Sequence, residues 1–378
     1  MLKSLLSNTL KIKPVKNGFV SAVNSLISCS STLKCSLLAR IAPAGMKVCL
    51  EADDKIKKQL DDIPSECSQS ERRYLYKFFR HIWSGVGQVV EIGPFLGGSS
   101  RAIALGMIDN PRISPDSRLL TFDRFGHYYG AEALRSFLQP LVKTGLISEK
   151  QLDDLGDNVN FFEIYKTIHA NSPYSRILLP IDLCVPDSKE QLEEGGQFLD
   201  FAEGTTSDAV FIDGCKSWFG TKYFMRKALG ISRPGTWYLF QDYGWYTCFW
   251  ISSFMYFFRE YFEFFSNVDF TYTFRLKSLI PPGEIDRIFP DKPELVGPQT
   301  FQEIYGFHIA NALERRDYLA ATAHSIHHAA VLAYVGKKSE AKQMLLKLLQ
   351  RPWVAGYEKH IHAALISPTY SPTGEIRF

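Results

Sequence analysis

Short apolar runs alternate with helix-like segments through the middle of the chain. The apolar runs predict strands at residues 88–93, 118–123, 175–183, 208–214 and 235–243. Between them, helical spacing of apolar residues predicts helices at 69–83, 101–107, 131–141 and 222–229. Strands that alternate with helices build right-handed βαβ units. The sequence therefore predicts an α/β fold, Rossmann-like and doubly wound, with a mostly parallel sheet.

Two extensions flank this alternating region. Residues 1–50 contain no Asp or Glu, seven basic residues and many Ser. We interpret residues 1–60 as a basic N-terminal extension, with an organellar transit peptide as the alternative. A Pro- and Gly-rich stretch begins near residue 281, and residues 300–349 have mostly helical spacing. The predicted regions are the extension, a Rossmann-like domain at 61–285, and a linker with a C-terminal helical appendage at 286–378.

The net charge, the cysteine pattern and the lengths of the apolar runs bear on the partners and the location of the protein. A formal net charge of +3 argues against nucleic acid as a partner. Seven Cys without a CxxC pair favour reduced thiols and a cytoplasmic location. The most apolar stretch, 248–265, carries Arg259, Glu260 and Glu263. We expect it to form a buried or lid helix and not a membrane span.

The stretch VVEIGPFLGGSS, residues 89–100, ends the first predicted strand. Ligands of open parallel sheets bind beyond the carboxyl ends of the strands, and Gly93 and Gly97 let the backbone turn tightly there. The stretch lacks the G-x-G-x-x-G pattern of dinucleotide sites, and Glu91 would repel a pyrophosphate but attract an ammonium group. Asp123 ends the second strand, where it could accept hydrogen bonds from a ribose. These features favour S-adenosylmethionine over a dinucleotide.

Four motifs together carry a resemblance to a known family. VVEIGPFLGGSS, LLTFDRF, DAVFIDGCKSW and RPGTWYLFQDY, in this order, resemble the class I S-adenosylmethionine-dependent methyltransferases. The chain is most similar to the branch with macrocin-type O-methyltransferases and cephalosporin-hydroxylase-like proteins, over about residues 69–275. The resemblance implies O-methylation of a small molecule or sugar hydroxyl.

The resemblance also implies roles for particular residues. The methionine end of the cofactor would be bound by Glu91, Gly93, Gly97 and Ser99. The ribose would be bound by Asp123, and the adenine by Asp182. Asp213 and Asp242 would face the methyl acceptor.

Metal dependence stays open. Metal-dependent members of the branch typically carry Asp-Gly-Asp and Asp-Asp in the last two motifs. This chain has Asp213-Gly-Cys215 and Gln241-Asp242, so two carboxylates are missing. Mg²⁺ prefers several oxygen ligands, and a Gln carbonyl and water could complete such a set.

Methyl transfer is an in-line displacement that often requires removal of a proton from the acceptor. Asp213 and Asp242 are the first candidates for this base and His127 is the third. Alternatively, Asp213 caps the next helix and His127 lies in a polar loop. A non-catalytic binding protein with the methyltransferase fold is an alternative function, and a nucleotide-dependent oxidoreductase is another.

Two further stretches allow two interpretations each. His324 and His328 lie one helical turn apart, a spacing that can bind zinc, but a solvated or dimer-facing helix is the favoured interpretation. Aromatic residues 245–265 could form a lid over the acceptor, or else an interface between copies of the chain or ordinary core. A homo-oligomer is therefore left open.

Overall fold

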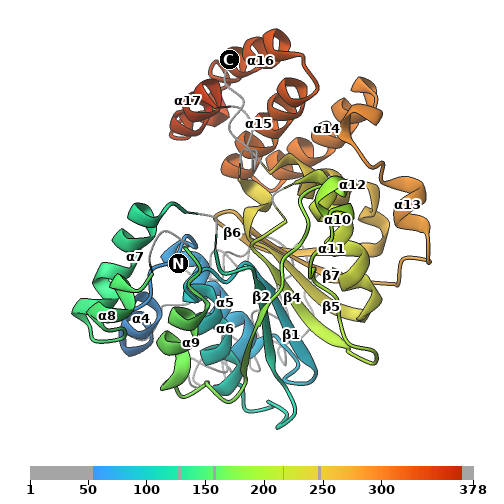
Figure 1. The fold of residues 1–378 in the computed structure, drawn as a ribbon. Coiled ribbons are helices and arrows are strands. Elements are labelled where there is room, and N and C mark those ends of the chain that lie inside the picture. The colour runs from blue at the N-terminus through green and yellow to red at the C-terminus, as the bar shows by residue number, and fades with distance from the viewer. Residues whose placement is uncertain (1–53, 127–128, 156–158, 216, 246–247, 368–378) are drawn as a thin grey trace, which may run out of the picture. The chain divides into compact units, whose positions relative to one another are not determined.

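Seven strands in the described residues form one sheet, in the order β3-β2-β1-β4-β5-β7-β6 (Figure 1). The computed structural model describes residues 54–126, 129–155, 159–215, 217–245 and 248–367. The strands are β1 (Gln88–Ile92), β2 (Leu119–Asp123), β3 (Leu178–Asp182), β4 (Ser207–Ile212), β5 (Ser232–Phe240), β6 (Phe262–Val268) and β7 (Thr271–Leu276). Neighbours among β1–β5 pair in parallel, whereas β7 pairs antiparallel with β5 and β6. The predicted doubly wound, mostly parallel sheet is confirmed.

The central strands are mostly apolar because both faces of the sheet are covered, and Glu91 of β1 and Asp208 of β4 are buried charged exceptions. Along β1, Val89 belongs to one hydrophobic cluster and Val90 to the other, and Phe211 and Ile212 of β4 divide in the same way. Each large side chain buried in this manner contributes about 1.5–3 kcal/mol.

The helices on one face of the sheet come from the first half of the chain. They are α4 (Asp54–Asp61), α5 (Gln69–His81), α6 (Gly98–Ile108), α7 (Ala131–Lys143), α8 (Glu149–Asp153) and α9 (Phe162–Ala170). Figure 1 shows them in blue to green beside the strands. The helix α10 (Lys189–Glu193) follows β3. The other face packs against α11 (Trp218–Gly230) and α12 (Phe249–Phe257).

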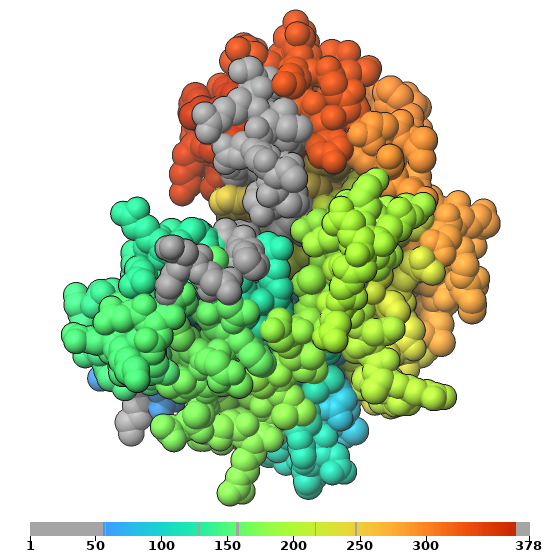
Figure 2. Space-filling view, in the orientation of Figure 1, coloured from blue at the N-terminus to red at the C-terminus, as the bar shows by residue number. Residues whose placement is uncertain are grey.

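Within the described residues, the C-terminal region adds five more helices, of which the first three pack on the second face and the last two pack against the third. They are α13 (Glu284–Ile288), α14 (Pro298–Glu314), α15 (Tyr318–Tyr334), α16 (Lys338–Leu348) and α17 (Glu358–Ile366). Short 3₁₀ turns are η1 (Gln241–Gly244), η2 (Arg259–Tyr261), η3 (Pro293–Leu295) and η4 (Pro352–Val354). In the space-filling view, α15–α17 form the red end of the face shown (Figure 2). Residues of α14 and α15 share one hydrophobic cluster with the sheet. The boundary at residue 285 stays a prediction.

The prediction of one helix over residues 248–265 is wrong in its second half. The helix α12 ends at Phe257, and β6 begins at Phe262 and pairs with β7. Such a dense aromatic run has no clear period of two or 3.6, so periodicity alone does not separate helix from strand. In the described part of the chain, no helix is both long and apolar enough to cross a membrane.

The expectation of a solvated or dimer-facing helix is wrong for His324, which is buried within the chain, whereas His328 is half-buried. The helix α15 packs against α12, α14 and α16, so that His324 and His327 are buried. The helix α15 ends before Gly336, whose φ is +90°, and α16 follows. Residues 1–53 of the predicted extension lie outside the described residues.

Candidate functional site

The tip of β1 is tied to the tips of both neighbouring strands. The Gly93 amide donates to the Phe122 carbonyl of β2 at 3.0 Å, and the Asp213 amide after β4 donates to the Ile92 carbonyl at 2.9 Å. Gly93 has φ +77°, and a Cβ there would lie 2.4 Å from the Asp213 carbonyl oxygen. Glycine is needed at this position because the loops after β1 and β4 touch through their backbones.

Gly97 faces the protein interior. It is the N-cap of α6 with φ +91°, and an added Cβ would lie 2.0 Å from His169 Nε2. The buried His169 ring is held by the Tyr174 hydroxyl at 2.9 Å and the Leu96 carbonyl at 3.2 Å. Gly97 therefore shapes the loop by packing against His169, and its predicted contact with a cofactor stays a prediction.

Glu91 is completely buried beneath the loop. Its two carboxylate oxygens accept hydrogen bonds from the Ser99 hydroxyl at 2.7 Å and the Ser100 hydroxyl at 2.6 Å. Burial raises the pKa of Glu91 to about 7, and the two serine hydroxyls oppose that rise. In this structure Glu91 organises the start of α6. Neither serine side chain caps that helix, since its N-cap is Gly97 without a side-chain hydrogen bond.

A cavity of about 130 Å³, the small cavity, lies at the tips of β1, β2 and β4. Its lining includes Gly93, Ser99, Asp123 and Asp213. The Phe125 amide donates to Asp123 Oδ1 at 3.0 Å, and burial raises the pKa of Asp123 to about 6. The volume of the small cavity lies below roughly 300 Å³, the lower end of the range for ligand pockets.

Three predicted residues lie elsewhere. Glu91 and Gly97 do not line the small cavity, and neither does Asp182. Asp182 is the last residue of β3, pairs in register with Asp123 and is exposed. His127 lies outside the described residues.

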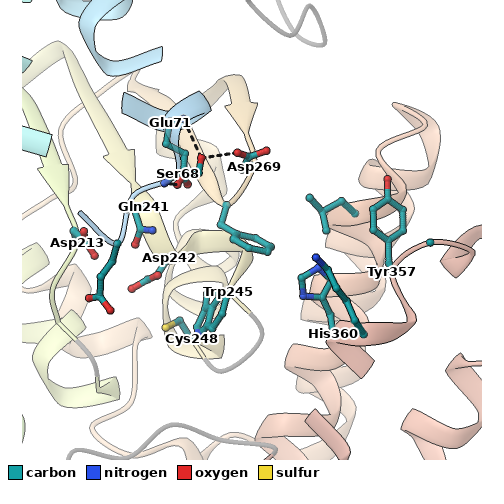
Figure 3. A pocket seen from close by; sticks show the side chains of 15 residues that line it. Ser68, Glu71, Asp213, Gln241, Asp242, Trp245, Cys248, Asp269, Tyr357 and His360 are labelled. Carbon is teal, nitrogen blue, oxygen red and sulfur yellow. Dashed lines mark hydrogen bonds between the residues drawn. The ribbon is translucent and has the colours of Figure 1, made fainter. Parts of the chain in front are cut away.

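A second cavity of about 500 Å³, the large cavity, lies between the ends of β4 and β5 and the C-terminal helices. Figure 3 shows Asp213, Gln241 and Asp242 on the sheet side, with Tyr357 and His360 across from them. Both predicted acceptor-side aspartates, Asp213 and Asp242, thus line one cavity.

The two cavities meet at Asp213 and Glu66, which line both. The Cys67 thiol donates to Asp213 Oδ2 at 3.7 Å, and burial followed by the charge of Asp213 raises the pKa of that thiol. Glu66 accepts a hydrogen bond from the Tyr129 hydroxyl. Asp213 therefore lies where a group bound in the small cavity would face a group bound in the large one.

The sequence-based predictions missed one wall of the large cavity. Ser68 and Glu71 form a capping box at the start of α5: the Glu71 amide donates to Ser68 Oγ at 3.1 Å and the Ser68 amide to Glu71 Oε2 at 2.7 Å. The Ser68 hydroxyl also donates to Asp269 Oδ2 in the β6–β7 turn at 2.6 Å (Figure 3). The S-x-x-E pattern could have revealed the capping box but not its distant partner.

The wall formed by α15 and the approach to α17 was missed as well. It consists of Leu319, Gly356, Tyr357, Lys359 and His360. No motif in the sequence connects these residues with the strands of the sheet, all of which lie earlier in the chain. The aromatic side of the cavity is completed by Trp245 and Phe270, whose ring centroids lie 5.4 Å apart.

Backbone strain gathers around the two cavities. Among the described residues, five other than glycine have a positive φ, and four of them adjoin this region: Phe95, Phe125, Cys215 and Asp269. The first three follow β1, β2 and β4 in turn. Such conformations cost of order 1–3 kcal/mol each and cluster at functional sites.

No group of three or more His, Cys, Asp or Glu side chains in the described part of the chain is arranged to hold a metal ion. Asp213, Gln241 and Asp242 do line the large cavity together. The Mg²⁺ prediction therefore stays open.

Comparisons with known proteins found structural similarity and no sequence family. No protein-family profile matches the chain, and no curated protein matches it. A SAH-bound methyltransferase from Podospora anserina is 14% identical, with 71% of this chain and 100% of that chain covered and a TM-score of 0.30. The O-methyltransferase NovP is 11% identical, with coverage of 66% and 100% and a TM-score of 0.38. An O-methyltransferase from Bacillus cereus with SAH is 18% identical, with coverage of 59% and 71% and a TM-score of 0.26.

At these identities and TM-scores, the similarities do not define the activity of this chain. The sheet itself, with parallel β1–β5 and the antiparallel β7 beside β5, is consistent with a Rossmann-like α/β methyltransferase fold.

Proposed function

We propose that this protein is an S-adenosylmethionine-dependent methyltransferase that acts on a hydroxyl group of a small molecule or sugar. The observation that carries the proposal is the meeting of the two cavities at Asp213. A group-transfer enzyme must place donor and acceptor on either side of one point.

The residues of the small cavity fit an adenosine-bearing cofactor. Asp123 presents a carboxylate at the end of β2, oriented by the Phe125 amide, and it would accept hydrogen bonds from ribose hydroxyls. Gly93 and Ser99 bring backbone and a hydroxyl to the same cavity. Bound S-adenosylmethionine would supply an electrophilic methyl group. Because the cavity measures about 130 Å³, its walls must move apart to admit the whole molecule.

The large cavity suits a polar acceptor with an apolar face. Asp213 and Asp242 would accept hydrogen bonds from acceptor hydroxyls, and one of them would take the proton as the hydroxyl oxygen attacks. Trp245, Phe270 and Tyr357 offer aromatic surface against which a ring can pack.

The first experiment measures cofactor binding by calorimetry. We expect saturable binding of S-adenosylmethionine and no binding of NAD. Asp123→Ala should weaken binding about tenfold or more, since it removes a carboxylate that accepts hydrogen bonds. Asp153→Ala, at the exposed end of α8, is the matched control. A preference for NAD would overturn the proposal in favour of an oxidoreductase.

A second experiment tests catalysis with a panel of hydroxylated acceptors. We expect Asp213→Asn to lower kcat by about 10²–10⁴-fold while S-adenosylmethionine still binds. Each assay is run with EDTA and with added Mg²⁺. Tight cofactor binding without turnover of any acceptor would support the non-catalytic alternative.

A further inference from the structure

A third cavity of about 180 Å³, the histidine cavity, lies behind the segment that carries Asp242. It is lined from α12, α14, α15 and the antiparallel strands β6 and β7. Tyr243, which directly follows Asp242, lines this cavity and not the large one.

Buried polar atoms without hydrogen-bond partners concentrate at the histidine cavity. Six such side-chain atoms occur in the described residues, and three belong to residues that line it: Tyr272 Oη, Arg315 Nε and His324 Nδ1. Tyr272 is 2% exposed and His324 is 1% exposed. A buried polar atom without a hydrogen-bond partner destabilises the folded state, so three such atoms beside one cavity indicate a ligand that would pair with them.

The charges of the lining favour an anion. Arg259 and Arg315 both line the histidine cavity, and no carboxylate does. Arg315 packs over the Phe264 ring at 4.4 Å, and Arg259 over the Tyr256 ring at 4.2 Å. The Asp317 carboxylate, whose charge reaches Tyr272, does not line the cavity and accepts hydrogen bonds from the Asn267 side-chain amide at 2.6 Å and the Ala320 backbone amide at 3.1 Å.

The histidines are neutral and do not add to that charge. Burial lowers the pKa of His308 to about 3 and that of His324 well below its usual range. His308 Nε2 donates to the Ser252 carbonyl at 2.9 Å, because a carbonyl can only accept. The His324 ring stacks on His308 with centroids 4.9 Å apart, which fixes the orientation of its unpaired Nδ1.

We propose that the histidine cavity binds a small organic anion, with its carboxylate or phosphate group paired to Arg315, Tyr272 and His324. All three side chains can donate a hydrogen bond, and an oxyanion accepts several. Much of the remaining lining is apolar and aromatic and includes Phe262, Phe274 and Phe307, so we expect the body of the ligand to be apolar and compact. This site is separate from the proposed methyl-transfer site.

Calorimetry with three probes tests the proposal at constant ionic strength: sodium benzoate, sodium acetate and inorganic phosphate. We expect saturable binding of benzoate, stronger than that of acetate. Tyr272→Phe and Arg315→Gln should each weaken benzoate binding about tenfold or more, because each removes a donor to the anion. Arg226→Gln, a side chain 57% exposed that pairs with Asp286 on the surface, should bind like the wild type.

Thermal unfolding of Tyr272→Phe tests whether weaker anion binding merely reflects a less stable fold. Without anion, we expect this variant to unfold at the same or a higher temperature than the wild type, since the deleted hydroxyl has no partner. The proposal is overturned if none of the three probes binds saturably, or if Tyr272→Phe and Arg315→Gln bind benzoate as tightly as the wild type. Binding of phosphate without benzoate would overturn the apolar ligand class.

Discussion

Single residues at the tip of β1 are constrained by close backbone approach. Gly97 combines a φ of +91° with a neighbour, His169, that would lie 2.0 Å from an added Cβ. Since His169 is buried and held at both ring nitrogens, it has little freedom to retreat.

Gly97→Ala should therefore destabilise the protein by about 2–4 kcal/mol, from overpacking and the positive φ together. Gly306→Ala is the control, because Gly306 lies within α14 with nothing within 4 Å of an added Cβ. That change should stabilise the protein by up to about 1 kcal/mol. Urea unfolding of both variants measures the difference, and equal effects would contradict the packing argument.

Glu91 makes stability depend on pH. Its pKa is about 7 in the folded protein against 4.5 ordinarily, so the folded state binds the proton more tightly than the unfolded state. The resulting stabilisation is fully present below pH 4.5 and is lost as pH rises through 7. The shift corresponds to about 3 kcal/mol at most.

Glu91→Gln should therefore lose less stability than the wild type between pH 5 and pH 8, as measured by urea unfolding. Part of the decline should persist, because burial also raises the pKa of Glu71 to about 7. The double variant with Glu71→Gln should be flatter still. A decline in Glu91→Gln equal to that of the wild type would show that Glu91 is not the titrating group.

At the scale of elements, the capping box of α5 does more than begin a helix. Ser68 caps α5 and also donates to Asp269 in the β6–β7 turn, whereas Ser148 caps the short helix α8 through the same kind of box without a distant partner. A comparison of the two serines therefore separates the contribution of the helix cap to stability from that of the hydrogen bond to Asp269.

Ser68→Ala should cost about 2–3 kcal/mol, since it removes a cap and a bond to a carboxylate. Ser148→Ala should cost about 0.5–1 kcal/mol. Thermal or urea unfolding checks this order. If both substitutions have the same effect, the Ser68–Asp269 hydrogen bond contributes nothing to stability.

The elements that the sequence predicted correctly share one property. Each of β1–β5 contains a short apolar run between segments of helical spacing, and the central strands β1 and β4 are covered on both faces. The strand β6 was missed because Phe262, Phe264 and Phe265 continue the aromatic pattern of α12. Its conformation depends on pairing with β7, a contact that no local pattern records.

Only the part of the candidate site that lies at the ends of the parallel strands could be predicted from the sequence. Asp123, Asp213 and Asp242 each end or follow a strand of the parallel sheet, and the sheet brings them to one edge. Glu91 also ends its strand region, but its side chain turns inward to the two serines. Side-chain direction at such a tip depends on partners from the next turn of chain, and neighbouring residue types alone do not fix it.

At the scale of the whole molecule, the sheet shares one core with the C-terminal helices α14 and α15. Phe301, Ile304 and Tyr305 of α14 are buried in the same cluster as β4 and β5. The Tyr305 hydroxyl also bonds the Ser253 hydroxyl of α12 at 2.8 Å. Removal of these helices would expose one face of the sheet region to water.

A chain cut after residue 297 should therefore be insoluble or bind hydrophobic dyes, because the apolar surface that α14 and α15 cover becomes exposed. A chain cut after residue 336 keeps both helices and should fold, with a lower melting temperature. Solubility, circular dichroism and thermal unfolding distinguish the two. Native-like unfolding of the shorter chain would show instead that residues up to 297 fold alone.

The two walls of the large cavity differ in how strongly the rest of the fold depends on them. Asp213 and Asp242 are fixed by a sheet on which the entire fold depends, whereas Tyr357, Lys359 and His360 belong to the approach to α17 and its first turn. Substitutions on the aspartate wall are therefore more constrained by folding than substitutions on the wall near α17. Changes near α17 can reshape the space opposite the aspartates while the sheet is left intact. Under the proposed function, the range of acceptors could therefore diversify in evolution while the aspartates stay in place.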